Sequence, residues 1–256
     1  MIWDFNPIAF SILGLDVRWY GLVYIGGFLL TLWLGYRLQK ITLNSPFSKE
    51  QFENAIFGVF LSGILGGRLG EFLFYSPHTL LDNFWEVFKI WHGGMSIHGG
   101  LLGSLIFLII WTRKNKIPLL SLTDILVLPL AITLVFGRIA NFLNGELVGR
   151  PTGGEWGMIF PHVDNIFRHP SQLYESGKNA FLSILIAYFF MRGYWKKRGG
   201  GTVLFVGGYG ILRFFIEFFR EPDGMIGWLS TGQWLCLGMI FSAFLLAKKE
   251  NFWHNE

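Results

Sequence analysis

The chain has little cysteine and few charged residues, and both features limit the class of protein to which it can belong. Cys236 is the single cysteine, which excludes an internal disulfide, and its neighbours Leu235 and Leu237 favour a small buried packing residue. Only 15% of the 256 residues are charged, whereas a soluble domain carries about 25%. These shortages exclude a disulfide-stabilised scaffold and argue against an ordinary soluble domain.

The residue patterns of several common chemistries are also missing. The six histidines show no His-Glu-x-x-His or other metal-ligand spacing, no Gly-x-Ser-x-Gly motif occurs, and no glycine-rich loop precedes a lysine and a hydroxyl residue. His78 and Asp82 are separated by three residues, one fewer than in the His-x4-Asp motif of glycerolipid acyltransferases. No basic face of the kind that binds nucleic acid is seen. We therefore predict no metal, no cofactor and no nucleic-acid partner.

Long hydrophobic runs are what the chain does have. Hydrophobic residues make up 52% of the chain and aromatic residues 18%, and the mean hydropathy is +0.45. Seven apolar stretches come near the roughly 20 residues that cross a bilayer, at about 18–37, 52–75, 97–112, 121–143, 173–191, 201–219 and 230–247. We predict an all-α polytopic membrane protein, with residues 1–256 as one integral membrane domain of seven transmembrane helices.

Basic residues orient these helices, because short cytoplasmic loops collect Lys and Arg. Such residues follow the first, third, fifth and seventh stretches: Arg37, Lys40 and Lys49; Arg113, Lys114 and Lys116; Arg192, Lys196, Lys197 and Arg198; Lys248 and Lys249. All clusters then fall on one side of the membrane, with the amino terminus outside and the carboxyl terminus in the cytoplasm. Residues 1–7 contain Asp4 and no basic residue, so no cleaved secretory signal is expected.

Two segments on the outer side are long enough to fold. Residues 76–96 are predicted to form an interfacial arm, in which apolar side chains recur at helical spacing: Leu81, Phe84, Trp85 and Phe88. Residues 145–172 combine several glycines and prolines with Trp156 and Phe160. They are predicted to form a small extracytoplasmic head with many turns, and an unstructured loop is the alternative.

The second stretch combines small residues with one close pair of charges. Its small residues fall at every fourth position: Gly58, Ser62, Gly66 and Gly70. Such a stripe is typical of helices that pack closely. Arg68 and Glu71 have i, i+3 spacing. A structural ion pair and a role for Arg68 at a functional site both remain open.

Charged residues within apolar stretches are costly, so their default interpretation is a functional site. Tyr209, Arg213, Glu217 and Arg220 lie on one face of the sixth predicted helix. Mutual neutralisation of Arg213 and Glu217, four residues apart, is the structural alternative.

Arg138 and Asn141 form a second polar face, on the fourth predicted helix. Two inward arginines with few compensating acids indicate an anionic ligand, because guanidinium groups match phosphate oxygens. A phospholipid head group is the obvious candidate. His98, in Gly93-Gly94-Met95-Ser96-Ile97-His98-Gly99-Gly100, falls at the same predicted membrane level, and its flanking glycines permit close approach of a ligand.

These residues resemble the bacterial prolipoprotein diacylglyceryl transferase family over nearly the whole chain. The family signature Gly-Arg-x-Ala/Gly-Asn-Phe-x-Asn-x-Glu-x-x-Gly is met without departure between Gly137 and Gly149. Further matches are Trp19-Tyr20-Gly21, Gly66-Gly67-Arg68, the segment around His98, Arg168-His169-Pro170-Ser171-Gln172-Leu173-Tyr174-Glu175, and Gly208-Tyr209-Gly210 with Arg213, Glu217, Phe218, Phe219, Arg220 and Pro222-Asp223.

The resemblance implies a substrate pair and a site. It implies transfer of the sn-1,2-diacylglyceryl group from phosphatidylglycerol to the lipobox cysteine in a prolipoprotein signal peptide, forming a thioether and releasing sn-glycerol 1-phosphate, at the outer leaflet of the bacterial inner membrane. The catalytic residues implied are His98, Arg138, Tyr209 and Arg213. The substrate-binding residues implied are Tyr20, Arg68, Gly99, Asn141, Asn144, Glu146, Gly149, Glu217 and Arg220.

The residues leave some alternatives open. A free thiol has a pKa near 8.5 and is only a few per cent thiolate at pH 7. Either His98 removes the thiol proton or Arg213 stabilises the thiolate without it. Intramembrane charge is also found in transporters or flippases of anionic lipids and solutes, although no inverted repeat is visible. A structural subunit, whose polar faces only join helices, is the third hypothesis.

Overall fold

The computed structural model describes residues 1–41, 46–89, 94–193 and 197–250. Within them, long α-helices occupy all seven stretches that the sequence predicts to be apolar helices: α1 (Trp19–Ile41), α2 (Lys49–Phe74), α4 (Ile97–Lys114), α5 (Leu119–Leu143), α6 (Ser171–Met191), α7 (Gly200–Ile216) and α8 (Thr231–Lys249). The chain forms two compact units, one made of Met1–Thr42 and Thr123–Glu256 and the other of Leu43–Leu122.

Five of the helical segments are long and apolar enough to cross a membrane. They are Trp19–Ile41, Lys49–Phe74, Leu119–Leu143, Gly200–Phe219 and Thr231–Lys249. The protein is therefore mostly helical with several membrane-spanning candidates. α6 is not among these candidates, and its buried residues include Gln172, Glu175, Lys178 and Asn179.

The smaller unit is built on the close crossing of α2 and α4. α2 begins at a capping box, in which Ser48 and Gln51 each bind the other's backbone N–H. The predicted small-residue stripe packs on α4, since a Cβ at Gly70 would lie 2.7 Å from Gly99 Cα. Glycine is needed at this crossing because any side chain would push the two backbones apart.

The predicted interfacial helix of the smaller unit is interrupted. α3 (Pro77–Asp82) and the 3₁₀ helix η1 (Phe84–Phe88) are separated at Asn83, whose φ of −151° and ψ of 84° are extended. The helical spacing predicted for this arm is thus divided between two short helices, and residues 90–93 of the predicted arm lie outside the described residues. Trp85 and Phe88 are nevertheless both exposed, at 72% and 56%. Arg68 holds this arm by donating to the carbonyls of Glu86 and Lys89, both at 2.8 Å.

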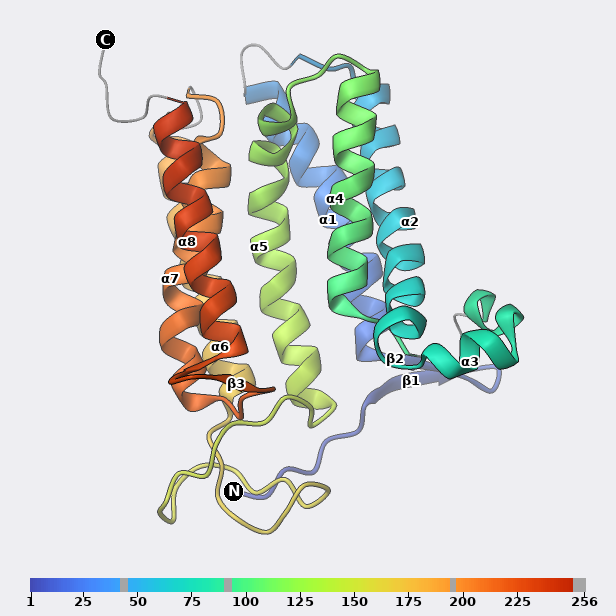
Figure 1. Ribbon diagram of the computed structural model, residues 1–256, viewed down its shortest axis with the longest axis vertical. Coiled ribbons are helices and arrows are strands. Elements are labelled where there is room, and N and C mark those ends of the chain that lie inside the picture. Colours follow the sequence, from blue (N-terminus) through green and yellow to red (C-terminus); the bar gives the residue numbers. More distant parts are fainter. Residues whose placement is uncertain (42–45, 90–93, 194–196, 251–256) are drawn as a thin grey trace. The chain divides into compact units, whose positions relative to one another are not determined.

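In the larger unit, the contacts show α1 and α5 to be antiparallel, and likewise α5 and α6, and α7 and α8 (Figure 1). Gly27 of α1 packs against Thr133 of α5. Asn179 of α6 donates to the carbonyl of Leu134 in α5 at 3.2 Å. The carboxylate of Asp124, near the start of α5, accepts hydrogen bonds from the backbone N–H groups of Gly199 and Thr202 at 2.6 and 2.8 Å, and so caps α7.

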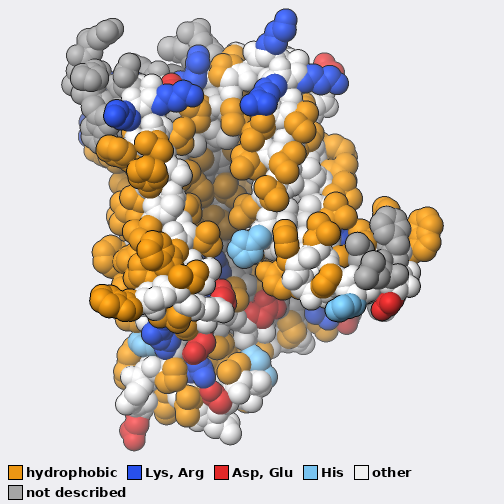
Figure 2. Space-filling model, viewed as in Figure 1, with side chains coloured by type: hydrophobic (Ala, Val, Ile, Leu, Met, Phe, Trp, Pro, Cys, Tyr) orange, Lys and Arg blue, Asp and Glu red, His pale blue; other side chains and the backbone are white. Residues whose placement is uncertain are grey.

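These directions bring the basic helix ends of the larger unit together. The carboxyl ends of α1, α6 and α8 lie at the same end of this unit as the start of α7, and they carry Lys40, Arg192, Lys248 and Lys249. In Figure 2 hydrophobic side chains cover the flanks of α7 and α8, and Lys and Arg side chains gather at one end of them. Polar side chains from the opposite ends of the same helices build the site described below.

The segment between α5 and α6 is folded. Isolated β-bridges join Ile2 to Ile159, Pro151 to Arg168 and Met158 to Arg168. A small core of Phe142, Met158 and Phe160 lies beneath Trp3, whose indole N–H donates to the carbonyl of Phe142 at 2.7 Å. The amino-terminal residues are thus part of this fold, which lies beyond one end of the helices (Figure 1).

Two short hairpins were not predicted by an all-α fold class. β1 (Ile8–Ile12) and β2 (Leu15–Arg18) pair antiparallel, as do β3 (Met225–Ile226) and β4 (Leu229–Ser230). The β1–β2 turn places both Leu13 and Gly14 at positive φ, 51° and 81°, which matches the twist of the strands. Both hairpins are too short to show a clear alternation of hydrophobic and polar residues.

Candidate active site

Tyr20, Asn141 and Glu146 come together at the polar end of the larger unit. Tyr20 stands in the first turn of α1, Asn141 in the last turn of α5, and Glu146 just after α5. The Tyr20 hydroxyl donates to Glu146 Oε2 at 2.7 Å, and Asn141 Nδ2 donates to the Tyr20 oxygen. Asn144 Nδ2 donates to Glu146 Oε1 at 3.2 Å. Both oxygens of this carboxylate are therefore oriented by neighbours predicted from sequence.

The loop that carries Glu146 is held by the start of α6 and by a close backbone approach. Gln172 Nε2 donates to the Glu146 carbonyl at 2.6 Å and Ser171 Oγ to the Leu147 carbonyl at 2.9 Å. Gly149 pairs with Arg220 in a β-bridge. A Cβ at Gly149 would lie 2.7 Å from both His169 Cβ and the Phe219 carbonyl oxygen. The structure thus explains this glycine by packing, whether or not it also contacts a substrate.

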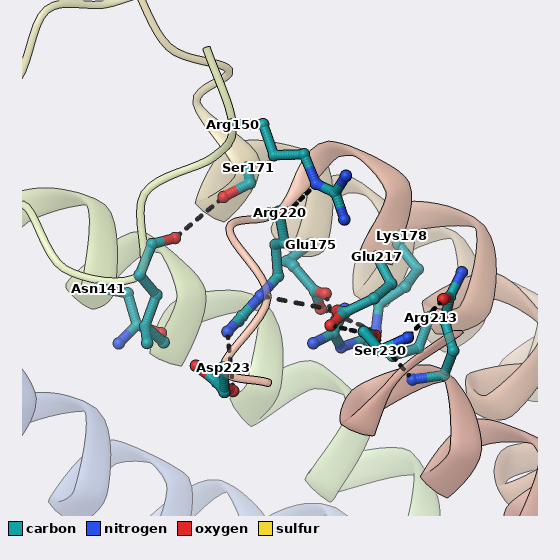
Figure 3. A network of polar contacts seen from close by, with 12 residues as sticks. Asn141, Arg150, Ser171, Glu175, Lys178, Arg213, Glu217, Arg220, Asp223 and Ser230 are labelled. Atoms are coloured by element: carbon teal, nitrogen blue, oxygen red, sulfur yellow. Dashed lines mark hydrogen bonds and ion pairs between the residues drawn. The ribbon is translucent and has the colours of Figure 1, made fainter. Parts of the chain in front are cut away.

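Arg138 and Arg213 meet at a buried carboxylate that the sequence analysis did not select. Glu175 of α6 is 1% exposed. Its Oε1 lies 3.0 Å from Arg213 Nε of α7, and its Oε2 lies 3.7 Å from Arg138 Nε of α5. Lys178 Nζ lies 2.9 Å from the same Oε2. One carboxylate therefore lies at ion-pair distance from three cations on three helices, and Figure 3 shows two of them, Arg213 and Lys178, beside Glu175.

Glu217 forms a second acidic centre beside the first. It is 1% exposed and contacts Arg213 one helical turn earlier. Ser230 Oγ donates to Glu217 Oε1 at 2.9 Å, and Arg220 Nε lies 3.8 Å from Oε2 (Figure 3). The predicted pairing of Arg213 with Glu217 is confirmed as a contact, so the structural alternative for these two residues accounts for part of the polar face.

The expectation of few compensating acids was therefore wrong, because Glu175 and Glu217 both lie among the arginines. The cluster still carries an excess of positive charge: four cations, Arg138, Lys178, Arg213 and Arg220, face these two buried carboxylates. The exposed Asp223, 3.7 Å from Arg220 Nη2, offsets one further charge. Burial, and then the positive charges of Arg213 and Arg138, lower the pKa of the Arg220 guanidinium. Such crowding of cations favours an anion.

Tyr209 joins the cluster through its ring. Lys178 Nζ lies 3.6 Å from the centre of the Tyr209 ring, which is cation–π geometry. Tyr209 and Arg213 are four residues apart in α7, so both project toward α6. Of the four residues predicted to share one helix face, Tyr209 and Arg213 lie on α7, whereas Glu217 falls in the 3₁₀ helix η4 (Glu217–Phe219) and Arg220 is extended just after it.

Arg138 links the two groups of residues. Its Nη1 donates to Asn141 Oδ1 at 3.4 Å, a long hydrogen bond, while its Nε faces Glu175. The Tyr20–Asn141–Glu146 group and the cationic cluster therefore form one continuous polar site. That site contains ten of the thirteen predicted residues: Tyr20, Arg138, Asn141, Asn144, Glu146, Gly149, Tyr209, Arg213, Glu217 and Arg220.

The other three predicted residues, Arg68, His98 and Gly99, belong to the smaller unit. Arg68 is buried and donates to backbone carbonyls of the arm. Gly99 lies at the crossing of α2 and α4. His98 is exposed in the first turn of α4, after the N-cap Ser96. Arg68 and Gly99 thus have structural roles, and a role of any of the three in catalysis stays a prediction.

The most important residues missed from sequence are Glu175 and Lys178. A signal for them was present, because Gln172, Glu175 and Asn179 follow i, i+3, i+7 spacing within a hydrophobic stretch. Polar residues at that spacing share one face of a helix, and ionisable residues inside an apolar helix are functional candidates by default.

Comparisons with known proteins agree with the resemblance seen in the sequence. Residues 7–248 match the family described as prolipoprotein diacylglyceryl transferase. Proteins named phosphatidylglycerol--prolipoprotein diacylglyceryl transferase are similar along most of their length. The one from Nitrosomonas europaea is 46% identical over 95% of this chain and 89% of its own. The one from Rhizobium meliloti is 44% identical over 93% and 88%, and the one from Idiomarina loihiensis 44% over 97% and 96%. A transporter or flippase is not favoured by these relatives.

Proposed function

Because the chain belongs to the prolipoprotein diacylglyceryl transferase family, we propose that it transfers the diacylglyceryl group of phosphatidylglycerol to the lipobox cysteine of prolipoproteins. The products are a thioether-linked lipid on the cysteine and sn-glycerol 1-phosphate. The observation that carries this proposal within the molecule is the cationic cluster beside Tyr20, Asn141 and Glu146. An excess of buried guanidinium groups suits a phosphodiester anion.

The chemistry is one substitution at carbon. The cysteine thiolate attacks the glycerol carbon of the diacylglyceryl group, so that a sulfur–carbon bond forms as the carbon–oxygen bond to phosphate breaks. The phosphodiester of phosphatidylglycerol carries one negative charge. The glycerol phosphate that leaves is a phosphate monoester and carries two. Arg138 and Arg213 stabilise that developing charge, because preorganised cations act most strongly where charge appears in the transition state. The thiol proton must leave before or during attack.

His98 and Arg213 are the two candidates for handling that proton. An imidazole with an ordinary pKa near 6.5 serves as a base at neutral pH. A guanidinium cannot accept a proton, but it stabilises the thiolate that forms when water accepts it. In both routes Tyr20, Asn141 and Glu146 orient the polar head group of phosphatidylglycerol by hydrogen bonds. Glu146 is exposed, which suits contact with a substrate.

The proposed topology places this site toward the outer leaflet of the bacterial cytoplasmic membrane. It comprises seven transmembrane helices, an extracytoplasmic head over residues 145–172 and an interfacial arm over residues 76–96. Basic ends of α1, α6 and α8 would face the cytoplasm, as positively charged loops usually do. The polar site lies at the opposite ends of these helices, where a signal peptide presents its cysteine after translocation.

A transfer assay in detergent tests the proposal. Purified protein is given radiolabelled phosphatidylglycerol and a lipobox peptide, beside the same peptide with Ser in place of Cys. Label on the peptide and released glycerol phosphate, both only with Cys, are the expected result. Neither product from folded protein that binds phosphatidylglycerol would overturn the proposed function.

A further inference from the structure

Glu175 contacts both of the arginines to which the reaction is assigned, and it does so from the same side of each. Its two oxygens approach Arg213 Nε at 3.0 Å and Arg138 Nε at 3.7 Å. Both are ion-pair contacts, and a carboxylate charge beside Nε favours one orientation of the rigid guanidinium plane. Figure 3 shows the Glu175 side chain reaching from α6 toward Arg213 and Lys178.

The ends of the two guanidinium groups remain available for a ligand. Nη1 of Arg138 meets Asn141, and Nη1 of Arg213 meets Glu217. Nη1 of Arg213 is buried without a hydrogen-bond partner among the described residues, although it lies at ion-pair distance from Glu217. Held at Nε, each arginine can turn Nη2 toward a phosphate oxygen without losing its contact with protein.

Charge balance explains why Lys178 accompanies Glu175. A buried carboxylate between two arginines already has positive neighbours, yet Lys178, whose side chain is 2% exposed, adds a third at 2.9 Å. The same ammonium stacks on Tyr209 at 3.6 Å. Stability alone does not require such a group, because apolar replacements of buried ion pairs are often neutral or stabilising. The arrangement instead retains net positive charge while the arginines stay anchored.

We propose that Glu175 is a positioning residue for the transfer reaction. It lies beside Nε of Arg138 and of Arg213, so that the Nη groups of both arginines are directed toward the phosphate that departs. Lys178 offsets the charge of Glu175 and supports the Tyr209 ring. This inference rests on the proposed function and assigns to α6 a role in catalysis that acts through residues of α5 and α7.

The variant Glu175→Gln separates orientation from charge. It keeps the size of the side chain, removes one negative charge and weakens both contacts at Nε. We expect kcat to fall by about 100-fold, since a misplacement near 1 Å can cost that much. KM for phosphatidylglycerol stays the same or falls, because the cluster becomes more cationic. A purely structural role would reduce the yield or the melting temperature and leave kcat and KM of the folded enzyme unchanged.

The double variant Glu175→Gln/Lys178→Met restores the original net charge but does not restore the ion-pair contacts at Nε of Arg138 and Arg213. Its kcat should remain low, and recovery to the wild-type kcat would show that charge balance, not orientation, matters. Glu53→Gln is the matched control, because Glu53 is about half exposed and pairs with Lys49 on the surface of α2. It should leave kcat and KM unchanged.

Two further measurements keep the inference testable. If Glu175→Gln does not fold, Glu175→Asp retains the charge and shortens the reach by one methylene, and we expect kcat below wild type with KM unchanged. Wild-type kcat in that variant, or in folded Glu175→Gln, would overturn the inference while the proposed function stands. Absence of transfer by the wild-type protein itself would instead overturn the proposed function.

Discussion

The hydroxyl group of Tyr20 donates a 2.7 Å hydrogen bond to the carboxylate of Glu146, 126 residues away in sequence. The same oxygen accepts from Asn141. One phenol therefore joins the first turn of α1 to the end of α5 and to the loop behind it. Its two hydrogen bonds connect the head-group side of the proposed site to Arg138, which Asn141 contacts.

Replacing Tyr20 by Phe removes both hydrogen bonds while keeping the ring. Leaving partly buried polar partners unsatisfied costs about 1–3 kcal/mol, so we expect kcat/KM for transfer to fall roughly 10- to 100-fold. Tyr24→Phe is the control, because Tyr24 stands one turn further along α1 with 54% of its surface exposed. Equal kcat/KM values in the two variants would contradict the role given to Tyr20.

Substituting Lys for Arg138 or Arg213 keeps the charge and loses the planar fork. We expect transfer to fall severely, by at least about 100-fold, with the protein still inserted and folded, because a point charge cannot replace two-point recognition of a phosphate. Activity is measured as glycerol phosphate released, and folding as the elution profile in detergent. Near-normal activity of Arg138→Lys would contradict the phosphate-binding role of Arg138.

The variant His98→Gln tests whether His98 is the base that removes the thiol proton. The substitution keeps a hydrogen-bonding side chain of similar length but removes the group that can take a proton at neutral pH. If His98 is the base, transfer slows while binding of phosphatidylglycerol is kept. Unchanged transfer would favour stabilisation of the thiolate by Arg213, and failed lipid binding would assign the imidazole to ligand positioning.

Gly149→Ala should destabilise the protein through packing. The new methyl group would lie 2.7 Å from His169 Cβ and from the Phe219 carbonyl, two groups that leave no room for it. Overpacking of this kind costs about 1–3 kcal/mol, which lowers the melting temperature and disturbs the loop that carries Glu146. Gly238→Ala is the control, because no heavy atom lies within 4 Å of a Cβ there. Its melting temperature should not fall.

The ion pair between Asp164 and Arg168 makes the 145–172 segment sensitive to acid. The hydrogen bond from Arg168 lowers the pKa of the Asp164 carboxyl below its ordinary 3.8. Because the pKa of Asp164 is lower in the folded protein than in the unfolded chain, its ion pair adds stability above pH 3.8. That stability is lost as the pH falls through the pKa of the folded protein. Asp164→Asn should therefore increase hydrogen exchange of this segment at neutral pH. The difference from wild type should vanish at the acid end, and a difference independent of pH would contradict this account.

Much of the helical framework and most of the site could be predicted from sequence. Long apolar stretches must be helical in a bilayer because every backbone N–H and C=O needs a partner within the segment. The face of Tyr209, Arg213, Glu217 and Arg220 follows from helical spacing alone. The break at Asn83 and the two hairpins did not follow, since short elements carry few residues from which a period can be recognised.

The compensating acids were missed for a different reason. Spacing shows which residues share one helix face, but it does not show which helix that face meets. Glu175 was not predicted because it lies on a third helix, α6, 37 positions after Arg138 in the chain. Only the packing of α5, α6 and α7 brings the three side chains to one point, and Figure 3 shows Glu175 and Arg213 meeting there.

The sequence by itself determined that this chain is a helical membrane protein, that its charged residues cluster on two helix faces and that its signature is that of a diacylglyceryl transferase. Those properties are local, because hydropathy, helical periodicity and sequence motifs depend on residues that are close together in the sequence. The tertiary structure alone decided that Glu175 anchors both arginines and that Lys178 stacks on Tyr209. Such contacts join residues that are far apart in the sequence, so they form only when separate helices pack against one another.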